Sequence, residues 1–469
     1  MIWILFVVIS VMIVPYHEPW ADEIQALLIA QETGFYDLMT QIPRQEGHTP
    51  LWYLLLKLSA AVFGESFNIA YISVFIMSAA VGIFLFGCKI PPAYKFLLPF
   101  GHYFLYQYNI IARNYCLSYL ALALLAALYE KRHIHRWPYA ANLFLLAEAS
   151  LVFALPAAAL GFFWIAEAYK NHRGSVKNYY LPFGFLCIAG LFTLWQILPF
   201  NTTLYAARLS HIDNSPAFLP IHLAEAFFIG QNLWLNLLFM GFTAWVMIRN
   251  AMNATFYEDV YRNSGVVMRF VAAWGSFILA YAFIRPMYYH QGLIWGLFLC
   301  STYMFFPDYV RRGRHYLFTA CAVMHIFWSV TSIRYDIDKP YSAQFGTMKI
   351  LQQYPKEKIT VAGYHTIPLK QLLGRNRLYI SPEERMYQNW ATYDISSIQT
   401  LINRHDDILA VDTAEAANAD LLYYQNPNKF YVYDIPAAAV YKGYIFFEQG
   451  ILLFIKRKSV LSGRDEDGK

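Results

Sequence analysis

The sequence predicts a polytopic α-helical membrane protein with a small C-terminal α/β domain, and three observations support this fold class. Apolar residues make up 58% of the 469 residues and charged residues only 14%, against about a quarter charged in ordinary soluble domains. Long uncharged runs fill residues 1–333, whereas residues 334–469 mix charged and apolar side chains. Basic clusters also recur between the apolar runs, as they do in the cytoplasmic loops of membrane proteins. We therefore expect a transmembrane domain over 1–333 and a second domain over 334–469.

The lengths of the apolar runs predict the spans. A hydrocarbon core about 30 Å thick needs roughly 20 apolar residues per helix, which gives about eleven spans. The predicted spans are 1–15, 67–88, 97–112, 114–129, 138–152, 154–169, 181–200, 231–248, 270–285, 290–306 and 316–332. The first run has no basic N-terminal region, so we expect an uncleaved helix, with a truncated start as the alternative. Glu148 and Pro156 interrupt the apolar stretch 137–168, which favours two short helices over one kinked helix.

The distribution of Lys and Arg predicts the orientation, because cytoplasmic loops carry the excess of both. With the N-terminus in the cytoplasm, all major basic clusters fall on the cytoplasmic side, and an odd number of spans places residues 334–469 outside. The net charge of +5 comes from these short clusters and not from one basic stripe, so we expect membrane lipids and no nucleic acid as partners. The five cysteines show no C-x-x-C spacing, and neither a disulfide framework nor a thiolate metal site is indicated.

The C-terminal part has the pattern of a small mixed sheet with helices. Short apolar runs at 358–363 and 407–411 are typical of buried strands. A helix is expected at 367–373, a polar segment at 396–404, and further sheet segments at 430–433 and 444–456. Tyr364, His365 and Tyr379 are either acceptor contacts or packing groups.

The outer loop over residues 16–66 holds the first candidate site. It opens with Trp20, Asp22 and Glu23, before an amphipathic segment at 24–32. An acidic pair at the mouth of a helix bundle is a candidate general base, but carboxylates also favour helix N-termini, so a capping role is the alternative. Residues 51–63 are expected to form an interfacial helix that carries Tyr53.

Two further clusters fall at the outer ends of predicted helices. The first contains Tyr108, Arg113 and Tyr115, and the second runs from Arg285 to His290. Arginine at the membrane edge is costly unless it snorkels or is paired, and a guanidinium facing a lipid phosphate would justify it. The alternatives for Arg113 are an interfacial anchor or an ion-pair partner for Glu148. Because the histidines show no HExxH spacing, no metal site is predicted.

The order of these parts resembles the polyprenyl-phosphate-sugar-dependent glycosyltransferases with the GT-C fold, which include protein O-mannosyltransferases and lipid A aminoarabinose transferases. The resemblance covers roughly residues 1–170. It rests on a first helix and an outer loop that opens with Asp22-Glu23, followed by two blocks, Gly47-His48-Thr49-Pro50-Leu51-Trp52-Tyr53 and Ala112-Arg113-Asn114-Tyr115.

The resemblance implies a membrane enzyme of the bacterial inner membrane that transfers a hexose or pentose from a polyprenyl phosphate to a lipid, glycan or protein on the periplasmic side. Asp22 would act as the base, with Glu23 as a substitute. The donor phosphate would be bound by His48, Arg113, Arg285 and His290. The substrate cavity would be lined by Trp20, Tyr53, Tyr108, Tyr115 and Glu148. No cofactor is obligatory, and a divalent cation stays an open alternative.

Two departures from the family pattern bear on this hypothesis. Relatives commonly carry an acid two positions before the arginine, where this chain has Ile111, and Thr49 replaces a frequent proline. Two alternatives therefore stay open. The first alternative is a transporter or flippase of lipid-linked glycans. The second is a non-catalytic partner protein that keeps the GT-C fold.

Overall fold

The computed structural model describes eleven stretches of the chain, namely residues 1–64, 67–198, 225–227, 264–283, 288–305, 316–380, 385–387, 408–412, 430–441, 444–448 and 450–456. The predicted span 231–248, the polar segment 396–404 and Arg285 lie outside these residues. The chain divides into two compact units. The first comprises Met1–Val14, Phe35–Leu55 and Ala70–Ser332, and the second comprises Pro15–Gly34, Leu56–Ile69 and Ile333–Lys469.

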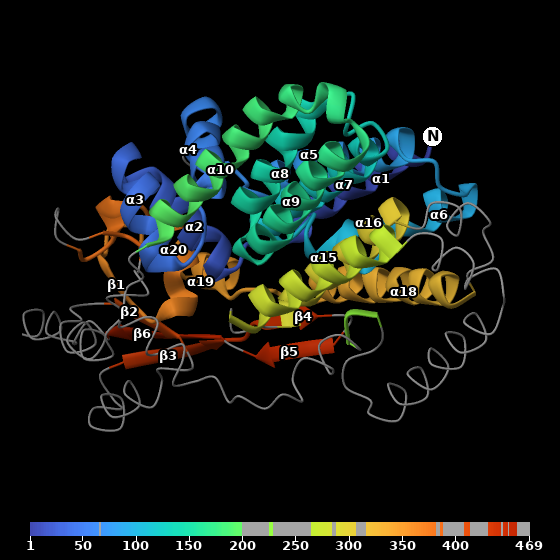
Figure 1. Ribbon diagram of the computed structural model, residues 1–469. Coiled ribbons are helices and arrows are strands. Elements are labelled where there is room, and N and C mark those ends of the chain that lie inside the picture. The colour runs from blue at the N-terminus through green and yellow to red at the C-terminus, as the bar shows by residue number, and fades with distance from the viewer. Residues whose placement is uncertain are drawn as a thin grey trace, which may run out of the picture. The chain divides into compact units, whose positions relative to one another are not determined.

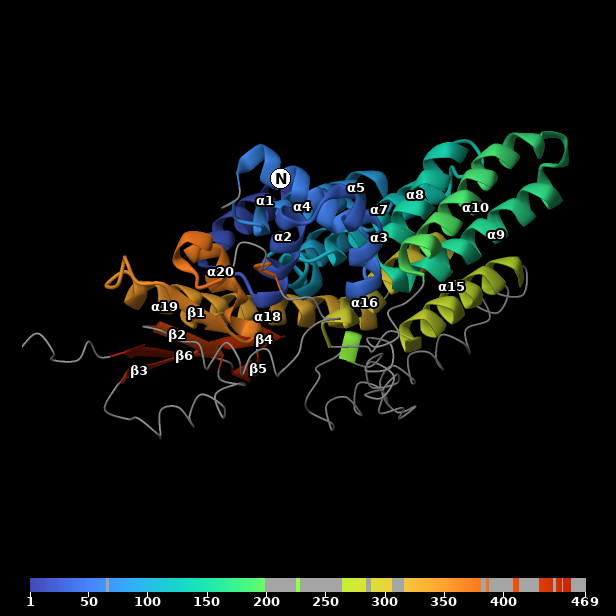
Figure 2. The same cartoon turned by 90° about the vertical axis from the view of Figure 1, so that its left-hand side faces the viewer.

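The first unit contains helices and turns, and its described residues include no strand. Its helices are α1 (Ile2–Ile13), α3 (Phe35–Glu46), α5 (Ala70–Gly87), α6 (Pro92–Leu97), α7 (Tyr115–Tyr129), α8 (Arg136–Ala149), α9 (Ala154–Asn171), α10 (Lys177–Ile197), α15 (Ser264–Phe283) and α16 (Gln291–Phe305). Helices α4 (Leu51–Phe63) and α18 (Tyr316–Asp338) have residues in both units. Helices α8, α9 and α10 pack side by side, α7 contacts α5, α8 and α16, and α15 packs on α9 (Figures 1 and 2).

Three described segments are long and apolar enough to cross a membrane, namely Ala70–Gly87, Leu151–Asn171 and Lys177–Ile197. Helix α1 with its short extension η1 (Val14–Tyr16) reaches that length only together with α2 (Ala21–Glu32), and the chain turns by 91° between them. Other apolar helices, such as α7, are shorter. The described residues thus support a helical protein with membrane-spanning segments, and the count of eleven stays a prediction.

The helix breaks follow local sequence. The stretch 137–168 forms two helices as predicted, because the chain is extended at Ser150 (φ −162°, ψ 134°) between α8 and the turn η4 (Leu151–Phe153). The predicted helix over 97–112 is wrong as one continuous element. It is divided into a 3₁₀ turn, η2 (Leu98–Phe100), and a short π-helix, η3 (Tyr103–Gln107). Pro99 lacks the N–H that a continuous helix needs, and Gly101 is extended where a Cβ would lie only 3.3 Å from the side chain of His325.

The second unit contains the mixed sheet that the sequence predicts. The strands lie in the order β1 (Ile359–Ala362), β2 (Ile408–Asp412), β6 (Ile451–Lys456) and β3 (Phe430–Ile435). Strands β1 and β2 are parallel, whereas β6 is antiparallel to both β2 and β3 (Figure 1). A separate pair consists of β4 (Ala438–Tyr441) and β5 (Tyr444–Glu448).

The predicted sheet segment 444–456 supplies two strands, β5 and β6, which belong to two different sheets. Gly450 lies just before β6, and a Cβ at this position would collide with the backbone carbonyl of Ile435. Only glycine permits this close approach of two backbones. The unit also contains α19 (Gln344–Leu351), η7 (Tyr364–Thr366), α20 (Ile367–Leu373) and η8 (Arg375–Arg377).

Helix α2 belongs to the second unit, where it packs against α20. Its last residue, Glu32, accepts hydrogen bonds from Arg375 Nη2 at 2.7 Å and from the backbone N–H of Met386 at 2.8 Å. Lys57 Nζ donates to the carbonyl oxygens of Ala30 and Thr33 at 3.0 and 2.9 Å, which satisfies acceptors left open at the helix end. The loop 16–66 was assigned to the membrane domain as a whole, and the structure clusters Pro15–Gly34 and Leu56–Ile69 with the C-terminal sheet.

Candidate functional site

Glu23 caps the helix that carries it. Its Oε2 atom accepts the backbone N–H of Trp20, the N-cap residue of α2, at 2.7 Å. The carboxylate is fully buried, with an exposed fraction of 0%. The capping alternative raised from the sequence is therefore confirmed for Glu23, and this geometry favours a structural role over that of a substitute base.

The buried imidazole of His17 also contacts the Glu23 carboxylate. His17 Nε2 lies 3.1 Å from Glu23 Oε2, and His17 Nδ1 lies 2.8 Å from Asp336 Oδ2. Burial lowers the pKa of His17, but the two carboxylates outweigh burial and raise it to about 10. The ring is therefore an imidazolium at neutral pH and donates to both acids. We call His17, Glu23 and Asp336 the buried triad.

Asp22 faces a different environment, formed by the C-terminal sheet. Tyr364 donates its hydroxyl hydrogen to Asp22 Oδ1. The backbone N–H of His365 donates to Asp412 Oδ2 at 3.1 Å, and the rings of Tyr364 and His365 meet edge to face at 5.5 Å. Burial lowers the pKa of His365, although the charges of Asp412 and Asp22 act in the opposite direction. The site therefore combines a half-buried carboxylate, a phenol and a neutral imidazole.

Strand topology explains why these residues meet. Tyr364 and His365 follow β1, and Asp412 is the last residue of β2, its parallel neighbour. The carboxyl ends of parallel strands lie at one edge of a sheet, where α/β proteins commonly bind ligands. Gly363 makes the turn with φ 97°, and a Cβ there would collide with the Asp412 carboxylate. The turn thus requires glycine.

The first unit brings together the two clusters that were predicted at outer helix ends. The Arg113 guanidinium lies 4.5 Å from the centre of the Tyr289 ring and 5.4 Å from that of Tyr115. Tyr108 donates its hydroxyl hydrogen to the carbonyl of Tyr289 at 2.7 Å, and the rings of Tyr115 and His290 are 5.4 Å apart. Arg113, Tyr108, Tyr115 and His290 are therefore neighbours, and Tyr289 joins them.

The end of α8 binds the residues that follow His48 and Arg113 in the chain. Thr49 donates its hydroxyl hydrogen to the carbonyl of Glu148, and Asn114 Nδ2 donates to the next carbonyl, that of Ala149, at 3.1 Å. The residues that directly follow His48 and Arg113 are thus bound to adjacent peptide groups.

The other predicted site residues of the first unit are mainly buried against neighbouring side chains. The Glu148 carboxylate accepts a hydrogen bond from Thr193 at 2.6 Å, which gives it a partner on α10. Tyr53 is 4% exposed and Ile111 is 1% exposed. In the second unit, Trp20 packs edge-on against Tyr341 at 6.5 Å.

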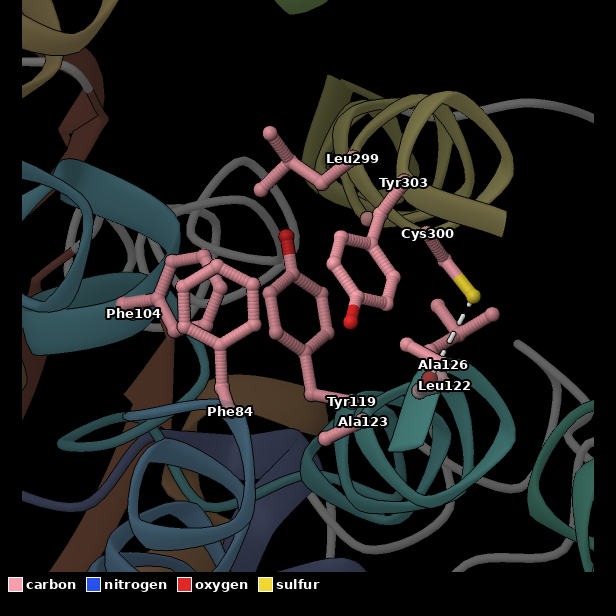
Figure 3. Close-up of a pocket in the computed structure, with 10 residues that line it drawn as sticks. Phe84, Phe104, Tyr119, Leu122, Ala123, Ala126, Leu299, Cys300 and Tyr303 are labelled. Carbon is pink, nitrogen blue, oxygen red and sulfur yellow. Dashed lines mark hydrogen bonds between the residues drawn. The ribbon is translucent and has the colours of Figure 1, made fainter. Parts of the chain in front are cut away.

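An apolar cavity lies between α5, α7 and α16, and its lining residue Tyr119 packs edge-on against Tyr108 at 5.2 Å. Phe84, Tyr119 and Tyr303 are among the residues that line it (Figure 3). Its accessible volume is about 20 Å³, and one water needs roughly 10–15 Å³. The cavity is too small for a sugar. Within the described ranges, no three His, Cys, Asp or Glu side chains are arranged to hold a metal ion.

Sequence reasoning overlooked His17, Asp336 and Asp412. Asp412 could have been predicted as a site residue, because it directly follows a buried apolar run, where a strand ends. His17 and Asp336 could not have been predicted, since their contact joins residues 319 positions apart.

The comparisons with known proteins give no family assignment. No protein-family model matches the chain, and neither a curated protein nor a solved structure does.

Proposed function

We propose that the chain is a membrane glycosyltransferase that moves a sugar from a polyprenyl-phosphate donor to a hydroxyl or amine of a lipid, glycan or protein acceptor. The proposal rests on the resemblance in residues 1–170 together with the chemistry of the two clusters described above. In this proposal, sugar transfer takes place on the side of the membrane that faces away from the cytoplasm.

The observation that carries the proposal is the meeting of three separately predicted segments in the first unit. The loop after His48 and the loop after Arg113 bind adjacent carbonyls of α8, and Arg113 stacks on Tyr289 beside His290. A guanidinium and imidazoles among tyrosines suit a phosphate whose negative charge grows as the sugar leaves. In this proposal, Arg113 binds the donor phosphate with His48 and His290 beside it.

Asp22 is proposed as the general base. Tyr364 fixes the Asp22 carboxylate by a hydrogen bond to Oδ1, and a carboxylate positioned in this way is suited to accept a proton. The acceptor oxygen or nitrogen then forms a bond to the anomeric carbon while the bond from that carbon to the phosphate oxygen breaks. The proton passes to Asp22, and the polyprenyl phosphate departs with the bonding electrons.

The test is sugar transfer by the purified protein from radiolabelled polyprenyl-phosphate sugars to extracted envelope acceptors. Asp22→Asn should lower the rate by about 100-fold or more, because a positioned general base contributes on that scale. Asp37→Asn, which changes a carboxylate in the first turn of α3, serves as the matched control and should keep full activity.

Donor binding without transfer by the wild-type protein would refute the enzyme and favour the transporter or the non-catalytic protein. These two are then separated by measuring the movement of a labelled lipid-linked sugar across proteoliposomes.

A further inference from the structure

A cluster of cations in the first unit lies far along the helices from the residues discussed above. Arg132 Nη2 donates to both carboxylate oxygens of Glu167, at 2.9 and 2.7 Å, and Arg269 Nη1 donates to Oε2 at 3.0 Å. His133 Nε2 is 3.2 Å from the same oxygen. The side chains of Arg132 and Arg269 are only 11% and 16% exposed. Two guanidinium groups and an imidazole thus share one carboxylate.

A third guanidinium extends the cluster. Arg136 lies 4.7 Å over the ring of Tyr179, and its Nε is buried without a hydrogen-bond partner among the described residues. The Tyr179 hydroxyl is 3.0 Å from His133 Nδ1, and the rings of His133 and His172 are 4.7 Å apart. Among the described residues, three guanidinium groups share one carboxylate, which leaves a net charge of two positive units, and buried positive charge of this kind is costly without further anions.

The surrounding surface has the composition of a membrane interface. The cluster lies where α9 ends and α10 begins, and both helices belong to segments long enough to span a membrane. Trp137, Tyr169 and Tyr180 project here with exposed fractions of 53%, 63% and 57%. Aromatic side chains of this kind collect at headgroup depth. Ile134 and Leu181, 73% and 76% exposed, add apolar surface that a lipid chain can cover.

We propose that this cluster is a binding site for the phosphodiester of an anionic glycerophospholipid, such as phosphatidylglycerol. Arg136 supplies a planar guanidinium whose Nε has no hydrogen-bond partner in the described part of the chain, and a guanidinium can bind two phosphate oxygens at once. Arg132 and His133 supply the positive field, and the exposed aromatic and apolar side chains contact the glycerol and acyl chains. The positive-inside rule assigns these basic helix ends to the cytoplasmic leaflet. This site is independent of the proposed transfer reaction.

Binding to the delipidated protein tests the proposal. The purified protein is titrated with short-chain phosphatidylglycerol or phosphatidylcholine, and bound lipid is counted by native mass spectrometry. Phosphatidylglycerol should bind with higher affinity, and Arg136→Gln should weaken it about fivefold, the effect of one interfacial cation. Lys89→Gln removes an equal charge from a side chain that is 72% exposed and pairs with Glu130 and not with Glu167, and should bind as the wild type does.

Three results would overturn the proposal. The first is equal binding of the two lipids by the wild-type protein, and the second is an equal loss in the Lys89→Gln control. The third is protection by inorganic phosphate that matches that of phosphatidylglycerol in a thermal unfolding assay, which would indicate a site for free phosphate. If Arg136→Gln does not fold, Arg136→Lys keeps the charge, and it should still lose affinity because an ammonium cannot bind two oxygens in one plane.

Discussion

At the scale of single residues, two adjacent carboxylates at the start of α2 have different surroundings. Successive helical residues point about 100° apart, so Glu23 turns into the buried triad while Asp22 turns toward Tyr364. The sequence alone presents the two acids as near equivalents. Their partners, which lie hundreds of positions away, distinguish a structural acid from a candidate catalytic one.

Arg113 provides a test of donor recognition. Arg113→Gln should raise the KM for the polyprenyl-phosphate donor by about tenfold or more, because a charge-assisted contact to phosphate is lost. Initial rates at varied donor concentration measure this effect. Arg334→Gln, which changes a side chain that is 80% exposed, should leave KM unchanged. An unaltered KM in Arg113→Gln would remove Arg113 from the donor site.

The turn after β1 provides a test of local geometry. Gly363→Ala should lower stability by about 2–4 kcal/mol, since it adds backbone strain to a collision with the Asp412 carboxylate. Gly374→Ala is the matched control, because Gly374 also has a positive φ, of 65°, but nothing lies within 4 Å of a Cβ there. Its cost should be about 1 kcal/mol. Equal shifts of the melting temperature would contradict the steric part of this account.

At the scale of elements, the buried triad connects the segment before α2 to the end of α18. Removal of His17 leaves two buried carboxylates without the cation between them, and the loss of one partner of a buried ion pair typically costs about 3–5 kcal/mol. His17→Gln should therefore lower the melting temperature far more than His135→Gln, which changes an exposed histidine. Comparable melting temperatures for the two variants would contradict this role.

The same triad predicts how stability depends on pH. The pKa of His17 rises from 6.5 to about 10 in the folded protein. The stabilisation from this ring is therefore complete below the lower value and is lost as pH rises through the upper one, a change on the order of 5 kcal/mol. Thermal unfolding between pH 6.5 and 10 should show a steeper loss in the wild type than in His17→Gln.

Apolar run length and turn residues made most elements predictable. The helices within 67–88, 114–129 and 137–168 and the strands near 359 and 408 follow from patterns read locally. The prediction of one helix over 97–112 was wrong because the apolar composition of the run was given more weight than Pro99. The segment 444–456 does form strands, and the change of sheet at Gly450 could not be predicted from composition. The grouping of Tyr364, His365 and Asp412 depends on which strands pair, and local sequence does not specify that.

At the scale of the whole molecule, orientation is the untested premise of both proposals. Cysteine labelling with a membrane-impermeant maleimide can settle it after the exposed Cys187 is replaced by serine. Tyr36→Cys, in α3, should react in right-side-out vesicles, and Asn171→Cys, at the end of α9, should react in inverted ones. Labelling of both positions from one side would refute the assigned topology.

The buried triad also has a consequence for biosynthesis. The ring of His17 leaves the ribosome long before its partner Asp336, which lies 319 positions later. At about 5–20 residues per second, this interval lasts on the order of tens of seconds. During that time His17 and Glu23 lack the third member of their charge cluster, so the segment around α2 cannot take its final place until most of the chain has been made. A protein whose first loop is completed by its last third should be sensitive to premature termination before α18, even where the earlier helices are intact.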